Sequence, residues 1–158
     1  MKCVMTDSRT KLHERKRGPA LFAVLAMCCS LASAAEIGQV KVVRGQVDLE
    51  RNGQTLPAKV GMRLETADVL RTGADGSVGI TMADNSLLSA GSNSILSLDR
   101  FDYDPTTNQG RFDTQLQKGS LSVISGRMAK QSPDAMTVRT PSAILGVRGT
   151  EFVLSAND

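Results

Sequence analysis

The sequence predicts an all-β domain of short strands, arranged as a β-roll or solenoid or as a sandwich, with no long helix. Two observations carry this prediction. From residue 37 onward, short apolar runs are separated by Gly, Asn, Asp and Pro at a spacing of about 8–12 residues. No segment of this region shows the 3.6-residue apolar period of an amphipathic helix. Its length suits one domain with a single core.

Residues 1–34 are expected to be a signal peptide that is cleaved off. A basic cluster at residues 15–17 precedes an uncharged segment, residues 20–35, that ends in small residues. This order is typical of secretory signals, whereas a membrane-spanning helix needs about 20 apolar residues. Cleavage after Ala34 fits best and cleavage after Ala35 nearly as well. The domain is therefore assigned to residues 35–158, and its location is expected to be periplasmic or secreted, in a bacterium.

Removal of the signal peptide would exclude several kinds of chemistry. All three cysteines and the single histidine lie within residues 1–34. The remaining chain would have no disulfide, no Cys or His nucleophile, and no zinc or copper site of the usual kind. Residues 1–34 also hold six of the 19 basic and two of the 16 acidic residues, which leaves 13 basic and 14 acidic. We therefore expect no basic surface for nucleic acid, no cofactor and no metal site.

The strands can be placed one by one. The first two are expected at residues 37–45 and 46–53, where Val47 and Leu49 alternate with polar residues and Asn52-Gly53 favours a hairpin turn. Residues 100–112 are expected to form a polar loop or a hairpin tip. Further strands are expected at 69–72, 77–82, 86–90, 94–98, 113–125, 136–140 and 144–154.

A weak repeat marks three positions where a strand should bend. At each position a basic residue is followed by glycine, after which the apolar run resumes. The three pairs are Arg44-Gly45, Lys118-Gly119 and Arg148-Gly149. Glycine within a strand pattern usually marks a bulge or a sharp bend. Such bends suit a chain that winds round a shared core as well as they suit a sandwich.

Within the closing segment, residues 138–154, the run 144–154 is apolar at both alternating sets of positions. This pattern predicts a strand buried on both faces, with Phe152 in the core. Arg148 and Glu151 flank Gly149, and we interpret them as an ion pair that closes a bend. The alternative is that Arg148 binds a ligand.

Other polar clusters are interpreted as structural. Asp99, Asp102 and Asp104 have oxygen ligands at short spacing, but a solvated loop is favoured over a Ca²⁺ site because Pro105 and Arg100 adjoin them. Without histidine, the serines are read as polar positions of half-exposed strands rather than nucleophiles. These serines are Ser86, Ser89, Ser92, Ser94 and Ser97, and Phe101 and Phe112 are expected in the core.

Three stretches resemble the FecR domain family, the periplasmic domain of bacterial surface-signalling regulators. They are residues 61–72, residues 84–98 and the closing segment, residues 138–154. The resemblance implies an all-β fold, a role in protein–protein signalling or envelope organisation, and no catalytic residues. Better-known relatives carry a sigma-factor-binding domain and a membrane helix before this domain. Here fewer than twenty residues precede the apolar segment, so direct sigma-factor contact is not expected.

Two functions remain open. The first is a non-catalytic periplasmic interaction module that docks with another envelope protein. The alternative is a structural or surface-associated domain that pairs with itself or binds cell-wall material. Relatives often continue with another hairpin after the closing segment, so the last strand here is expected to be an open edge. Exposed strand edges serve both functions, because an added strand binds through backbone hydrogen bonds. No stable membrane anchor is expected after cleavage.

Overall fold

A computed structural model describes residues 36–132, 134–147 and 151–156, and strands make up nearly all of their regular structure. The predicted signal peptide lies outside the described residues. The all-β prediction is confirmed, and the only helix within the described ranges is the short α1 (Arg127–Gln131). The strands are β1 (Gly38–Arg44), β2 (Val47–Arg51), β3 (Gln54–Pro57), β4 (Arg63–Leu64), β5 (Val69–Thr72), β6 (Ser77–Met82), β7 (Leu87–Ala90), β8 (Ile95–Tyr103), β9 (Gly110–Ile124), β10 (Met136–Arg139), β11 (Ile144–Gly146) and β12 (Glu151–Ala156).

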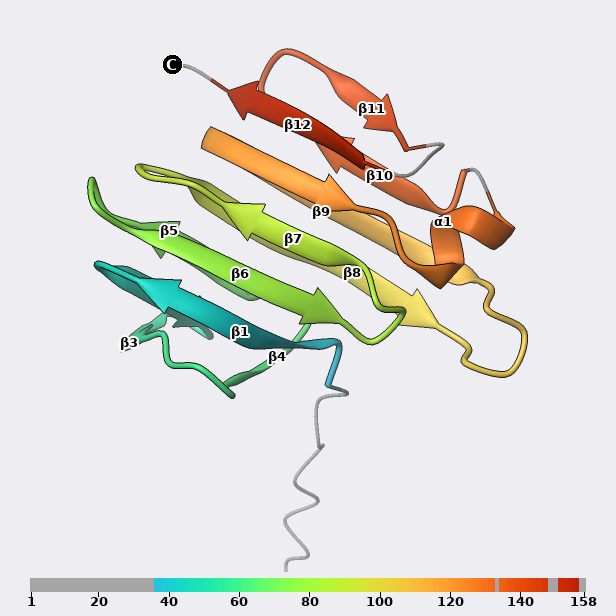
Figure 1. Ribbon diagram of the computed structural model, residues 1–158, viewed down its shortest axis with the longest axis horizontal. Helices are drawn as coiled ribbons and strands as arrows, with labels where there is room; N and C mark the ends of the chain where they lie inside the picture. Colours follow the sequence, from blue (N-terminus) through green and yellow to red (C-terminus); the bar gives the residue numbers. More distant parts are fainter. Residues whose placement is uncertain (1–35, 133, 148–150, 157–158) are drawn as a thin grey trace, which may run out of the picture. The chain divides into compact units, whose positions relative to one another are not determined.

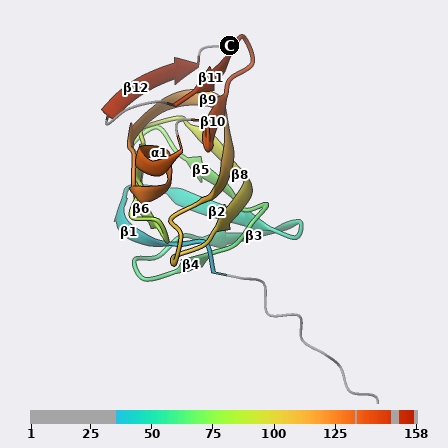
Figure 2. The ribbon, with the colours of Figure 1, turned by 90° about the vertical axis from the view of Figure 1, so that its right-hand side faces the viewer.

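The strands form one sheet that is folded into two layers (Figures 1 and 2). Layer A contains, in order, β4, β1, β6, β7, the second half of β9, and β12. Layer B contains β3, β2, β5, β8, the first half of β9, β10 and β11. All of these pairs are antiparallel except β9 with β10. The long strand β9 therefore belongs to both layers and joins them.

The core lies between the layers and is built from two rows of cross-strand neighbours. In layer A, one row runs through Val40, Ile80, Leu88 and Val123. In layer B, the matching row runs through Leu49, Leu70, Leu96 and Leu116. All eight side chains are buried. Burial of one such side chain is worth about 1.5–3 kcal/mol, so these rows dominate the stability of the fold.

The chain passes between the layers at sharp bends, as the glycine pattern predicted. Gly45 and Gly119 have φ of 60° and 90°, which side chains disfavour. Neighbouring bends are tied by backbone hydrogen bonds, from Gly73 N–H to the Gln46 carbonyl (2.9 Å) and from Gly91 N–H to the Ser120 carbonyl (3.0 Å). The third predicted bend, at Gly149, lies outside the described residues.

The β8–β9 hairpin is longer than the sequence indicated. Residues 100–112 were expected to be a loop or hairpin tip, but β8 continues to Tyr103 and β9 begins at Gly110, so only 104–109 form the tip. Phe101 and Phe112 face each other across these strands, with ring centroids 5.4 Å apart. Both are buried, as predicted, and their contact extends the pairing into a polar stretch of sequence.

The prediction for the closing segment is wrong in one respect. Residues 144–154 do not form one strand buried on both faces. β11 pairs with β10 in layer B and β12 pairs with β9 in layer A, so each lies at an edge. Ile144 and Val153 are 73% and 71% exposed. An apolar run does not reveal that its two ends lie in different layers, and here β11 is exposed at all three residues and β12 at alternate residues. Phe152 is half-buried and packs against the core.

Candidate interaction surface

The acidic residues of the β8–β9 hairpin are engaged in local contacts. Asp102 accepts a hydrogen bond from Arg100 Nε at 2.6 Å. Asp104 accepts bonds from the backbone N–H of Thr106 (2.8 Å) and the hydroxyl of Thr107 (2.9 Å), and these bonds lower its pKa. Within residues 36–132, 134–147 and 151–156, no three His, Cys, Asp or Glu residues are grouped to hold a metal ion. These contacts are those of an ordered turn.

The serines have a different role from the one predicted. Ser86, Ser94 and Ser97 are buried rather than half-exposed. The Ser86 hydroxyl donates to Asp84 (2.7 Å) and accepts from the Gly126 N–H (2.9 Å). The prediction failed because alternation alone cannot distinguish an outward polar residue from an inward one that satisfies the backbone at a turn. Among these serines, Ser89 lies outward on a strand.

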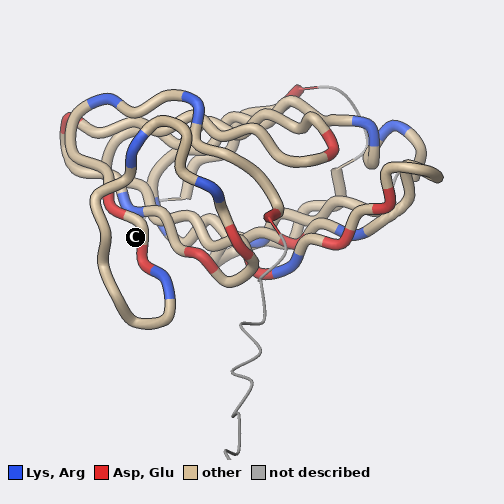
Figure 3. The backbone as a smooth tube through the Cα atoms, turned by 90° about the horizontal axis from the view of Figure 1, so that it is seen from below, with Lys and Arg blue, Asp and Glu red and all other residues tan. Residues whose placement is uncertain are grey.

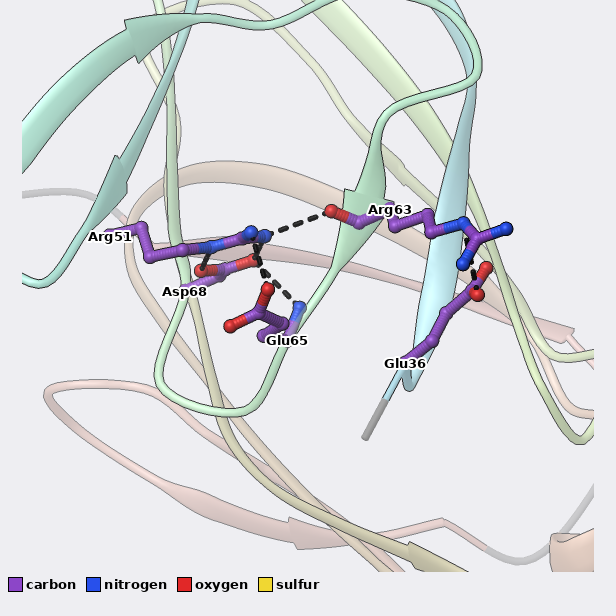
Figure 4. A network of polar contacts seen from close by, with 5 residues as sticks. All are labelled: Glu36, Arg51, Arg63, Glu65 and Asp68. Atoms are coloured by element: carbon purple, nitrogen blue, oxygen red, sulfur yellow. Dashed lines mark hydrogen bonds and ion pairs between the residues drawn. The ribbon is translucent and has the colours of Figure 1, made fainter. Parts of the chain in front are cut away.

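The strongest polar network joins β2 to the turn before β5, and the sequence analysis did not find it (Figure 4). Arg51 donates two hydrogen bonds to the Asp68 carboxylate, from Nε (2.7 Å) and Nη2 (2.6 Å). Its Nη1 contacts Glu65 at 2.6 Å, and Nη2 also donates to the Arg63 carbonyl at 2.8 Å. The hydrogen bonds to Asp68 raise the pKa of Arg51.

This network is closed rather than open to a ligand. Asp68 is fully buried, and its carboxylate also accepts the Glu65 backbone N–H at 2.8 Å. Every guanidinium nitrogen of Arg51 has a protein partner, so the group holds the β4 region against β2. No short-range sequence pattern could have identified the pair, because 17 residues separate Arg51 from Asp68.

The accessible features of the domain are its strand edges. The edge at β3 contains Pro57, which cannot donate a ladder hydrogen bond, and β4 at the other end has only two residues. In contrast, β12 has six residues, no proline and a single charged residue, Glu151. Of the strands in the described ranges, only β9 pairs with β12. The remaining edge strand, β11, has only three residues. The predicted open edge is therefore found at β12, which is the longest of the edge strands.

Taken together, the folded sheet defines a β domain whose accessible features are strand edges and broad faces. The family described as FecR protein matches residues 68–158, more than half of the sequence, and the chain belongs to the FecR family. This family is associated with the bacterial envelope and with the regulation of signalling there. No curated protein matches the chain, and no solved structure does. In the described part of the chain, no helix is long and apolar enough to cross a membrane.

Proposed function

We propose that the protein is a non-catalytic interaction module of the periplasm, which docks with another envelope protein during signalling. The observation that carries this proposal is the open edge of β12. A strand of the partner adds to this edge, and backbone hydrogen bonds extend layer A by one strand. Exposed Val153 contributes an apolar contact beside the added strand.

Several further observations support a binding role over catalysis. The polar clusters named above form internal hydrogen bonds, and each guanidinium nitrogen of Arg51 has a protein partner. The wide hollow beside the β8–β9 hairpin, about 650 Å³, is lined by strand and turn residues, and its two carboxylates, Asp102 and Asp104, accept local hydrogen bonds. FecR membership points in the same direction, because the family is linked to envelope signalling.

The export component of the proposal is tested by mass spectrometry of the periplasmic fraction. The processed chain should begin at Ala35 or Glu36, since the small residues before them suit cleavage. Full-length protein retained in the inner membrane would contradict export as a soluble domain.

The edge component is tested by capture of partners from a periplasmic extract. Val153→Lys places a charge at the open edge and should reduce capture of a defined partner about tenfold or more. Ile144→Lys is the matched control, because Ile144 is equally exposed but lies on β11. The control should capture the partner as the parent does.

The same experiment distinguishes the alternative function. Retention on insoluble cell-wall material, with no defined protein captured, would favour a structural role and contradict docking. Equal loss of capture in both variants would show that binding does not depend on the β12 edge.

A further inference from the structure

The outward face of layer A is uncharged at its centre, in contrast to the outward face of layer B. Strands β6 and β7 and residues 119–124 of β9 contain no charged residue. In layer B, β2, β5, β8, residues 110–118 of β9, and β10 all contain at least one. In Figure 3, charged residues gather in one layer and toward the strand ends, and leave the middle of the other layer bare. The solvated face of a sheet normally carries polar residues, charged ones among them, so a face without charge across three neighbouring strands is unusual.

The central residues of this face form a trough beside a ridge. The trough is a cross-strand row of small residues, Gly79, Ser89 and Ser122. The ridge is the adjacent row, in which Leu87 and Ile124 are neighbours and each is 42% exposed. The two rows are two residues apart along the strands, about 7 Å, because side chains on one face recur at every second residue.

Two further apolar residues extend the trough row at its ends. Val42 of β1 is paired with Gly79, and Val153 of β12 is paired with Ser122. They are 45% and 71% exposed. The face therefore spans five strands, from β1 to β12.

We propose that this face binds a second copy of the same chain and forms a symmetric dimer. Consider a twofold axis that lies in the plane of the face, parallel to the two rows and midway between them. This axis brings the ridge of each copy over the trough of the other. Leu87 then lies over Ser89 of the second copy, and Ile124 lies over Ser122 of the second copy.

Two properties favour a second copy over an unrelated protein. The ridge and the trough lie on the same patch, and β7 and β9 each contribute one residue to both, so the patch can face a copy of itself as an isologous interface requires. The centre of the patch holds no charge, and the charged end of the ridge row, Glu151, pairs with Ile124. The twofold axis places Glu151 over Val153 of the second copy and not over its Glu151, which limits like-charge repulsion. The strands of the two facing sheets run nearly aligned in this arrangement, which is the common packing of stacked sheets.

The size of the face sets the expected strength of the dimer. Five strands at about 4.8 Å and about six residues at about 3.3 Å give a patch of roughly 24 by 20 Å per copy. Two copies would bury on the order of 1,000 Å², which is the lower limit for a specific interface. We therefore expect a reversible dimer with a Kd on the order of 10 μM. This contact uses the outward side chains of layer A and not the backbone hydrogen bonds of the β12 edge. Val153 belongs to both surfaces, so the dimer is tested with Ser89→Arg, which lies away from that edge.

Analytical ultracentrifugation between about 1 and 500 μM tests the dimer, on the chain expressed from its full sequence and purified after any processing. The parent should shift from monomer to dimer across this range. Ser89→Arg puts a bulky charge in the trough and should raise the Kd at least about tenfold. Gln117→Arg is the matched control, because Gln117 is an exposed residue of β9 in layer B, and its dimerisation should be unchanged. A parent that stays monomeric at 500 μM, or a control as disrupted as Ser89→Arg, overturns the proposal.

Cross-linking tests the relation of ridge to trough directly. A Leu87→Cys variant is mixed with a Ser89→Cys variant and treated with a short bismaleimide. The mixture should yield more cross-linked dimer than either variant alone, because residue 87 of one copy lies over residue 89 of the other. The parent provides the background from Cys3, Cys28 and Cys29. Preferential cross-linking of either variant with itself overturns this twofold arrangement.

Discussion

At the scale of single residues, the buried charge of Asp68 is the most demanding feature of the fold. A carboxylate removed from water is costly unless charged and polar donors surround it. Arg51 supplies two of these donors and the Glu65 backbone N–H a third. Burial of Asp68 thus requires its ion pair with Arg51. The conformation of the loop between β3 and β5 depends on the same ion pair.

Removal of Arg51 should therefore destabilise the domain strongly. Arg51→Ala leaves the Asp68 carboxylate buried without its countercharge, and we expect a loss of about 3 kcal/mol in the free energy of unfolding. Arg63→Ala is the control, because Arg63 forms an exposed ion pair with Glu36 at 3.2 Å and should cost less than about 0.5 kcal/mol. Urea denaturation measures both. Equal, small losses would show that water replaces Arg51 beside Asp68.

Asp113 gives the domain an acid-sensitive contribution to stability. The hydrogen bond from Arg111 Nε, at 2.8 Å, lowers the pKa of this buried carboxyl in the folded state. A lowered folded-state pKa means that the contribution is complete above about pH 4 and is lost as the pH falls through the folded value. Asp99 acts in the opposite direction, because partial desolvation at its largely exposed position raises its pKa, so its protonation favours the folded state.

Urea midpoints measured between about pH 5 and pH 2 should separate these two carboxyls. The parent should lose stability on acidification. Asp113→Asn should flatten that loss, because the variant has no carboxylate to protonate at this position. Asp99→Asn should steepen it, since it removes the opposing group. A profile that neither substitution changes would contradict both assignments.

At the scale of elements, the bends of the sheet depend on glycine for two separate reasons. Gly119 has a φ of 90°, and a Cβ added there would lie 2.5 Å from the Cα of Ser94. Gly53 also has a positive φ, 75°, but no atom lies within 4 Å of an added Cβ. The two positions thus separate backbone strain from steric conflict.

Gly119→Ala should cost on the order of 2 kcal/mol or more, because strain and clash add. Gly53→Ala should cost about 1 kcal/mol, since only the backbone is strained. Thermal denaturation of both variants measures the difference. If Gly53→Ala were as harmful as Gly119→Ala, the close approach of Ser94 would not be what requires glycine in β9.

The elements that the sequence predicted well are those defined by local chemistry. Asn52-Gly53 marks the turn between β2 and β3, and alternation in 77–82 and 86–90 located β6 and β7. The errors arose where distant pairing decides the outcome. The rings of Phe101 and Phe112 extend a hairpin through polar residues, and the segment 144–154 divides between two layers.

The candidate surface was also only partly predictable. An open last strand was expected, and β12 fulfils that expectation within the described residues. The uncharged face of layer A was not foreseen, because its rows combine residues from five strands, β1, β6, β7, β9 and β12. Each strand alone reads as an ordinary half-exposed strand, and only the register shows that Gly79, Ser89 and Ser122 are neighbours.

At the scale of the whole domain, β9 couples the two layers. Its first half pairs with β8 and β10 in layer B, and its second half pairs with β7 and β12 in layer A. The core rows of the two layers also face each other, so neither layer can keep its apolar side buried without the other. We therefore expect both layers to unfold in one cooperative transition.

Two spectroscopic probes test this coupling. Tyr103 is the only tyrosine in a chain without tryptophan, and it lies in β8 of layer B, with its hydroxyl bonded to Asn108 at 2.7 Å. Its fluorescence reports on layer B, whereas far-ultraviolet circular dichroism reports on the strands of both layers. The two thermal transitions should coincide, and hydrogen exchange in β7 should be as slow as in β5. Loss of the tyrosine signal well below the circular dichroism transition, together with faster exchange in β5 than in β7, would show that layer B unfolds separately and that β9 does not bind the layers into one unit.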